Sequence, residues 1–214
     1  MSKLFDKPFS RFESLGDNCE FGFFLRMAGN EISSFFRWTS IGDFHKLNSL
    51  IINRLENAFV YDDLKPLSEH MVLSEKHKIG FHTRMKSHVI DGERLFKFNE
   101  SVIKGLYLTE TLKVKHLRTK FLHGLTKESK IYVVKGANSA DVVSALSNTI
   151  KSFGRGCVLH VVSTDESEMV SKVIRVEPNL YMGFIDQFAD YNNADKVSFN
   201  SWSLLLKNAE REII

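Results

Sequence analysis

The sequence predicts an α/β fold: a single domain over residues 1–214, with a mixed, mostly parallel sheet flanked by helices and a central antiparallel hairpin. The last third carries the clearest signal. Two apolar strands, 131–134 and 158–162, enclose an amphipathic helix over 141–153, which is typical of a parallel strand–helix–strand unit. A second signal is Asp91-Gly92, a preferred pair for a two-residue hairpin turn. With only 3 Pro and no Gly/Ser/Pro-rich linker, the chain shows no domain boundary.

The first third of the chain alternates strands with helices. A short strand ends at Gly16, and a helix follows that Asp17 or Asn18 would cap and Gly29 would stop. A second short strand then leads into a second helix. The predicted ranges are 11–15 and 34–39 for the strands and 19–28 and 43–57 for the helices.

The hairpin turn sets the register of the middle of the chain. If Asp91 and Gly92 are the turn, the numbers of paired residues sum to 183, which separates an apolar face from a polar one. This register places Asn99 opposite Arg84 and diagonal to His82 on the polar face, roughly 7–8 Å away between backbones. The elements predicted after the hairpin, besides the parallel unit, are a helix over 100–124, a strand over 173–176 and a helix over 201–211.

Composition and charge narrow the classes of partner. The net charge of +3 is scattered, so nucleic acid is not an expected partner; the densest basic stretch, 113–120, is interpreted as a solvated helix face, with a phosphate-binding face as the alternative. No signal peptide and no 18-residue apolar segment occur, so we expect a cytoplasmic protein without a membrane span. Cys19 and Cys157 are then free thiols, and neither their spacing nor any nucleotide-binding motif predicts a metal or cofactor.

The strongest candidate for a chemical centre is Cys19, at the start of the first helix. Unpaired N–H groups and the helix dipole favour a thiolate there, and the same N–H groups can stabilise an oxyanion. Gly16 lets the backbone approach a substrate. Glu20 argues the other way, because a neighbouring carboxylate raises the pKa of a thiol unless it points elsewhere. The alternative is that Cys19 is a small core residue, which is the interpretation we give to Cys157.

A cysteine nucleophile needs a base and a group that orients the base. Among the 8 histidines, His82 stands out because it begins a strand on the polar face with Asn99 near it, whereas His160 lies within a buried strand. The predicted catalytic residues are therefore Cys19, His82 and Asn99. An Asn before a helix is also an ordinary cap, so that alternative stays open for Asn99.

The segment 14–22 (SLGDNCEFG) resembles the opening of a bacterial family labelled papain-like cysteine peptidases. The likeness extends over most of the chain, and its Gly-Asp-Asn-Cys-Glu-Phe string is fairly specific, while the later matches are weak taken singly. Those later matches are 36–38, 81–83, 131–134, 183–189 and Trp202.

The resemblance implies Cys19 as the nucleophile and His82 as its partner. Similar segments often stand beside glycosyltransferases and other surface-polysaccharide enzymes, which implies a carbohydrate setting and partners from that pathway. Many members resemble Ser-Pro-Phe-Asp-Trp where this chain has SFFRW at 34–38, so Arg37 replaces an Asp. An arginine could instead bind a carboxylate or phosphate.

The sequence is compatible with two main functions. The first is a cysteine-dependent hydrolase or acyltransferase acting on a peptide, amide, ester or glycan substrate. The second is a carbohydrate-pathway transferase or binding module without cysteine chemistry, in which the turn at 17–20 and Arg37 hold a sugar or nucleotide and the loop at 135–139 contacts a phosphate. An assembly partner without activity is a third reading. The predicted substrate-binding residues are Gly16, Asp17, Asn18, Glu20, Arg37 and Trp38.

Overall fold

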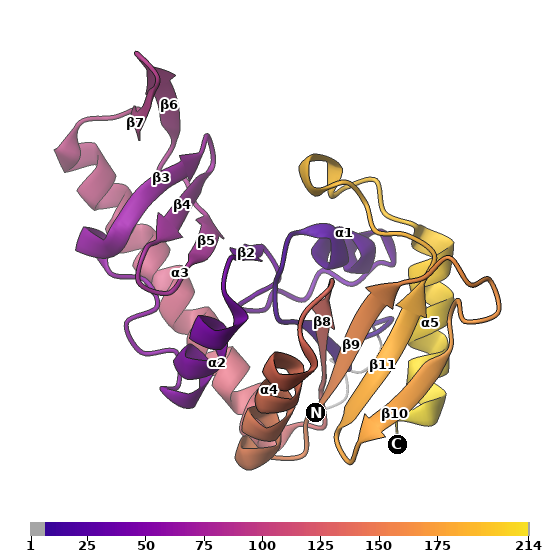
Figure 1. Ribbon diagram of the computed structural model, residues 1–214. Coiled ribbons are helices and arrows are strands. Elements are labelled where there is room, and N and C mark those ends of the chain that lie inside the picture. The colour runs from indigo at the N-terminus through magenta and orange to yellow at the C-terminus, as the bar shows by residue number, and fades with distance from the viewer. Residues whose placement is uncertain (1–6, 214) are drawn as a thin grey trace.

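The computed structural model describes residues 7–213 and has a five-stranded sheet at its centre (Figure 1). The strand order is β1 (Phe12–Ser14), β8 (Ile131–Lys135), β9 (Cys157–Ser163), β11 (Leu180–Ile185) and β10 (Val173–Glu177). The first four strands of this order run parallel, and β10 pairs antiparallel at the edge. The predicted fold class is confirmed, and so is the parallel unit near the C-terminal end, with β11 as a strand that the sequence analysis did not identify.

Helices cover both faces of this sheet because successive strand residues point to opposite sides. One core cluster joins α1 (Glu20–Met27) and α5 (Phe199–Glu212) to one set of strand side chains. The other cluster joins α4 (Ala140–Phe153) and the C-terminal part of α3 (Glu100–Lys127) to the alternate set, and α2 (Phe44–Ile52) packs against α4. The layering predicted from the sequence is therefore present, with α1 on the same face as the last helix (Figure 1).

A second, four-stranded antiparallel sheet lies beside the end of β1. Its strand order is β2 (Thr39–Ile41), β5 (Ile79–His82), β4 (Met71–Ser74) and β3 (Leu64–Ser68). The strand predicted at 34–39 is shifted, because the buried rings of Phe35 and Phe36 enter the core from a turn and pairing begins only at Thr39. The helix predicted at 43–57 ends earlier, at Ile52.

The hairpin is present with the predicted register. Strands β6 (Ser87–Ile90) and β7 (Glu93–Phe96) pair Ser87 with Phe96, and both Asp91 and Gly92 have positive φ, at 49° and 84°, as a type I′ turn requires. The pairing does not extend back to His82 as predicted. Residues 83–86 break the strand, because Lys86 N–H turns back to the carbonyl of Arg84 and Met85 is fully buried. His82 therefore belongs to the four-stranded sheet.

Two short 3₁₀ helices complete the described chain. The first, η1 (Tyr61–Asp63), leads into β3, and the second, η2 (Tyr191–Asn193), lies in the long connection before α5. Within residues 7–213, no helix combines the length and apolar character needed to cross a bilayer.

Candidate functional site

The turn between β1 and α1 holds four of the predicted site residues in an uncommon backbone conformation. Gly16 and Asp17 both have positive φ, at 93° and 89°. Asn18 Oδ1 accepts a hydrogen bond of 3.0 Å from Glu20 N–H, the first N–H of the helix. Cys19 is the N-cap residue, and its carbonyl accepts from Phe23 N–H. The turn therefore positions Cys19 where the helix begins, at the carboxyl edge of the parallel sheet, where ligands of open α/β sheets commonly bind.

Gly16 is required at this turn for two reasons, and we expect Gly16→Ala to destabilise the fold by about 3 kcal/mol. A Cβ at Gly16 would lie 2.3 Å from Ile41 Cγ1, and the positive φ adds strain. Gly29→Ala is the matched control, because Gly29 also has positive φ, 83°, but no heavy atom within 4 Å of its added Cβ. Chemical denaturation should give about 1 kcal/mol for Gly29→Ala. Equal losses in the two variants would contradict the close packing of β2 against the turn.

A buried ion cluster, formed by Asp17, Glu20 and Lys135, links this turn to the sheet. Glu20 is 0% exposed, and its carboxylate accepts from Lys135 Nζ at 2.8 Å and from Trp202 Nε1 at 3.0 Å. The same Lys135 ammonium lies 3.1 Å from Asp17 Oδ2 and 4.6 Å from the ring centroid of Phe188. Burial raises the pKa of Asp17, and Lys135 partly offsets that effect. Glu20 was predicted to contact substrate; it is instead engaged in the interior and holds the turn in place.

The Cys19 thiol is half-buried, and desolvation raises its pKa to about 11. Glu20 does not cause this shift, because its carboxylate points into the ion cluster. No positive charge in the described part of the chain counters the desolvation. At neutral pH Cys19 is therefore a protonated thiol, in contrast to the thiolate that its position at a helix start favours.

Trp38 packs on the face of α1 that begins with Cys19. Residues three and four positions apart share a helix face, so Cys19 lies on the same side as Gly22 and Phe23. The Trp38 ring centroid is 5.1 Å from that of Phe23, and the Arg26 guanidinium lies 4.5 Å from the Trp38 ring. A Cβ added to Gly22 would lie only 3.1 Å from the indole, so the glycine permits this close contact.

Arg37, predicted to bind an anion, is buried, and its guanidinium is hydrogen-bonded to the backbone. Its guanidinium donates to the backbone carbonyls of Asn30, Ile32 and Gly22 at 2.7, 2.7 and 3.1 Å. The side chain is 1% exposed. Arg37 therefore connects the loop after α1 to the helix and directs the neighbouring Trp38, and its charge is not presented to a ligand.

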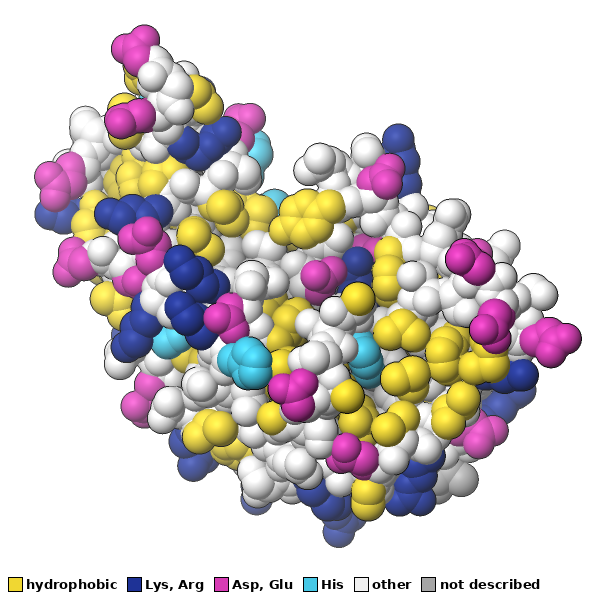
Figure 2. All heavy atoms as spheres, viewed as in Figure 1, with side chains coloured by type: hydrophobic (Ala, Val, Ile, Leu, Met, Phe, Trp, Pro, Cys, Tyr) yellow, Lys and Arg dark blue, Asp and Glu magenta, His cyan; other side chains and the backbone are white. Residues whose placement is uncertain are grey.

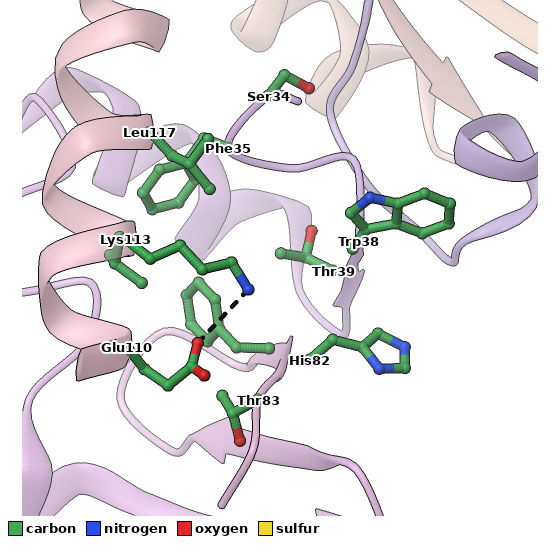
Figure 3. A pocket seen from close by; sticks show the side chains of 11 residues that line it. Ser34, Phe35, Trp38, Thr39, His82, Thr83, Glu110, Lys113 and Leu117 are labelled. Carbon is green, nitrogen blue, oxygen red and sulfur yellow. Dashed lines mark hydrogen bonds and ion pairs between the residues drawn. The ribbon is translucent and has the colours of Figure 1, made fainter. Parts of the chain in front are cut away.

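His82 and Trp38 line one pocket of about 40 Å³, formed by the segment before β2, the end of β5 and the middle of α3 (Figure 3). In Figure 3 the two rings point the same way, away from α3. Glu110, which the sequence analysis did not single out, is 4% exposed and lies 3.3 Å from Arg84 Nε and 3.4 Å from Lys113 Nζ. A carboxylate inside a long, otherwise mixed helix gives little sequence signal, because its partners lie on another element.

The His82 imidazole is neutral at pH 7. Partial burial lowers its pKa below 6.5, and the positive charges of His70 and Lys113 add to the effect. Strand β2 lies between this histidine and the turn that holds Cys19, because Thr39 pairs with Phe81 and Ile41 N–H donates to the Asp17 carbonyl. Two strand spacings, about 10 Å, therefore separate the two backbone segments. The side chains of Cys19 and His82 would therefore have to span the width of β2 to meet.

Asn99 takes the alternative role that the sequence left open. It is the N-cap residue of α3, and its Oδ1 accepts from Val102 N–H at 3.1 Å. Because the strand breaks after His82, the register of the hairpin no longer brings Asn99 to the imidazole. His160 is a core histidine, as its position in a buried strand predicted: it is buried, and its Nε2 lies 2.8 Å from the carbonyl oxygen of Gly136.

Figure 2 shows a hollow between the projecting hairpin and the connection that carries η2, with histidine and broad hydrophobic surface at its base. Comparisons with models of known families, with curated proteins and with solved structures found no match for this chain. Fold and site together define an α/β protein with a mixed, mostly parallel sheet and a smaller antiparallel sheet beside it.

Proposed function

We propose that this chain is a cysteine-dependent hydrolase or acyltransferase whose reactive groups come from the start of α1 and the end of β5. The observation that carries the proposal is the position of Trp38. Its indole contacts the face of α1 that starts at Cys19, and it also lines the pocket that contains His82. Trp38 thus lies next to both elements that carry the predicted catalytic residues, α1 with Cys19 and β5 with His82.

The protonation states support general-base catalysis in preference to a resting thiolate–imidazolium pair. The raised pKa of Cys19 keeps the thiol protonated, and the lowered pKa of His82 keeps the imidazole neutral and able to accept a proton. His82 would take the thiol proton as Cys19 attacks a peptide, amide or ester carbonyl, and would return it to the leaving group. Because Glu20 N–H is already bonded to Asn18, other N–H groups of the turn would stabilise the oxyanion.

Thiol alkylation tests this proposal with an internal reference. The pKa of Cys157 is also raised to about 11 by burial, so without a base both thiols should react slowly with iodoacetamide at pH 7.5. We expect Cys19 to be labelled at least about tenfold faster than Cys157, and this advantage to be lost in His82→Ala. Peptide mapping by mass spectrometry measures both rates. Equal, slow labelling of the two thiols, unchanged in His82→Ala, would rule out cysteine catalysis.

Carbohydrate binding without cysteine chemistry is the second candidate, and the lining of the same pocket favours it. Trp38, Thr83, His82 and Glu110 all line this small pocket, so an aromatic ring and hydrogen-bonding groups lie around its rim, where the edge of a sugar could rest. Stabilisation by UDP-glucose in a thermal-shift assay, retained in Cys19→Ser and lost in Trp38→Ala, would support this function. The carbohydrate setting implied by the family resemblance belongs to this candidate.

A further inference from the structure

A second cavity, of about 460 Å³, lies at the free edge of β1, between α3 and the loop that follows α1. Phe12, Leu25 and Ile32 contribute apolar surface to it. Its volume is in the range of small-molecule sites, which are commonly apolar with a few polar groups that orient the ligand. Apart from Ser34 at the border, none of its residues lines the pocket that contains His82.

Two polar groups meet at Gly124, in the wall of this cavity, without a hydrogen-bond partner within residues 7–213. Glu13 is 9% exposed, and its carboxyl makes no hydrogen bond within residues 7–213. The Tyr132 hydroxyl, from the neighbouring strand, is also buried and has no hydrogen-bond partner among those residues. Both groups approach Gly124 of α3: a Cβ built there would lie 3.6 Å from Tyr132 Oη and 3.7 Å from Glu13 Oε2. Buried polar groups are nearly always paired in folded proteins, so this convergence indicates a missing partner.

The charges around Glu13 favour an anionic partner. Lys120 on α3 and Lys130 after it both line the cavity, and each ammonium donates to a backbone carbonyl. Glu128 pairs with Lys130, whose Nζ lies 3.0 Å from its carboxylate, and lies 3.4 Å from His123 Nδ1, so within residues 7–213 Lys120 is the cavity lysine without a carboxylate in salt-bridge range. Of the acidic and phenolic groups at the cavity, those of Glu13 and Tyr132 have no hydrogen-bond partner within residues 7–213.

Both free groups can donate a hydrogen bond. Burial raises the pKa of Glu13 to about 7; Lys130 and Lys120 oppose this effect and Glu128 adds to it. Burial also raises the pKa of Tyr132, so its hydroxyl keeps the proton. At or below pH 7 the cavity therefore presents a carboxylic acid and two ammonium groups, one of them paired with Glu128, and the Tyr132 phenol lies behind its wall at Gly124.

We propose that this cavity binds a small monocarboxylate with an apolar body, whose carboxylate lies against Gly124 between Glu13 and Tyr132. The protonated Glu13 and the Tyr132 hydroxyl donate to it, and the two lysines provide positive potential. The positive charges of Lys120 and Lys130 repel a protonated amine. An alcohol carries no charge, so it gains no attraction to them.

Isothermal titration of the full chain with hexanoate, hexanol and hexylamine at pH 6 tests the ligand class. We expect hexanoate to bind at least about tenfold more tightly than either analogue. Raising the pH to 8.5 should weaken hexanoate binding by about 30-fold, because Glu13 loses its proton. In Glu13→Gln the affinity should no longer depend on pH over this interval. Absence of hexanoate binding, or equal binding of hexylamine, would overturn the proposal.

A matched pair of glycines in α3 tests the location. Gly124→Ala places a methyl group between Glu13 and Tyr132 at ordinary contact distances, so the variant should fold, and alanine favours the helix. Gly105→Ala brings the same gain in helix propensity, with nothing within 4 Å of the new Cβ. We expect Gly124→Ala to lose hexanoate affinity at least about tenfold and Gly105→Ala to retain it. Equal affinity in the two variants would place the carboxylate elsewhere and overturn the proposed site.

Discussion

Replacing Lys135 with methionine is expected to lower the free energy of unfolding by about 3–5 kcal/mol. Lys135 is 4% exposed, and its ammonium lies between the carboxylates of Glu20 and Asp17. Methionine fills a similar volume but leaves the fully buried Glu20 carboxylate without its cation, with only the Trp202 N–H as a donor. Urea denaturation measures the loss.

Lys104→Met is the control for removing a lysine from an ion pair. Lys104 Nζ lies 2.6 Å from Glu100 Oε1, but both side chains are exposed on α3, so the variant should leave the stability nearly unchanged. Adding Glu20→Gln to Lys135→Met should recover part of the loss, because the uncompensated charge is removed. If Lys135→Met is no worse than Lys104→Met, the buried cluster does not hold the Cys19 turn.

Glu13→Gln is expected to stabilise the ligand-free protein by about 3 kcal/mol at pH 8.5 and to change little at pH 4. The pKa of Glu13 rises from 4.5 to about 7 on folding, because burial penalises the carboxylate. The folded state therefore binds the proton more tightly than the unfolded state. Stability contributed by the protonated acid is full below pH 4.5 and is lost as the pH rises to 7. Glutamine has no charge to lose, so only the wild-type protein should weaken.

Denaturation midpoints of the two proteins at pH 4, 5.5, 7 and 8.5 check this window. Glu100→Gln serves as the control, because Lys104 lowers the pKa of the exposed Glu100, so that its pH dependence lies below 4.5 and has the opposite sign. A constant difference between wild type and Glu13→Gln across the four pH values would show that Glu13 titrates normally.

The fold elements predicted well are those encoded over a few neighbouring residues. The type I′ turn at Asp91-Gly92 was predictable because few residue pairs accept positive φ at both positions. The strands on either side of α4 were predictable because continuous apolar runs mark strands buried on both faces. The strands β3 and β4 were not predicted, because Pro66 interrupts β3 and most of the side chains of β3 are not buried.

The site residues were harder to predict, for the same physical reason. The break after His82 depends on Met85 entering the core, which no pattern near the hairpin indicates. Arg37 was interpreted as an anion-binding residue because a guanidinium has many hydrogen-bond donors. In the folded chain, carbonyl groups of the loop after α1 accept hydrogen bonds from these donors. Asn99 was ambiguous from the start, and the position of the strand break left it as a cap.

The sequence by itself determined the local conformations: the glycine turn before Cys19, the helix that starts there, and the register of the hairpin. Tertiary structure alone decided the chemistry of that turn. Lys135 is 115 residues from Glu20 along the chain, and the pairing of β8 with β1 brings the two together. Dihedral preferences act between neighbours, whereas burial, ion pairing and the pKa values that follow depend on which distant segments pack together.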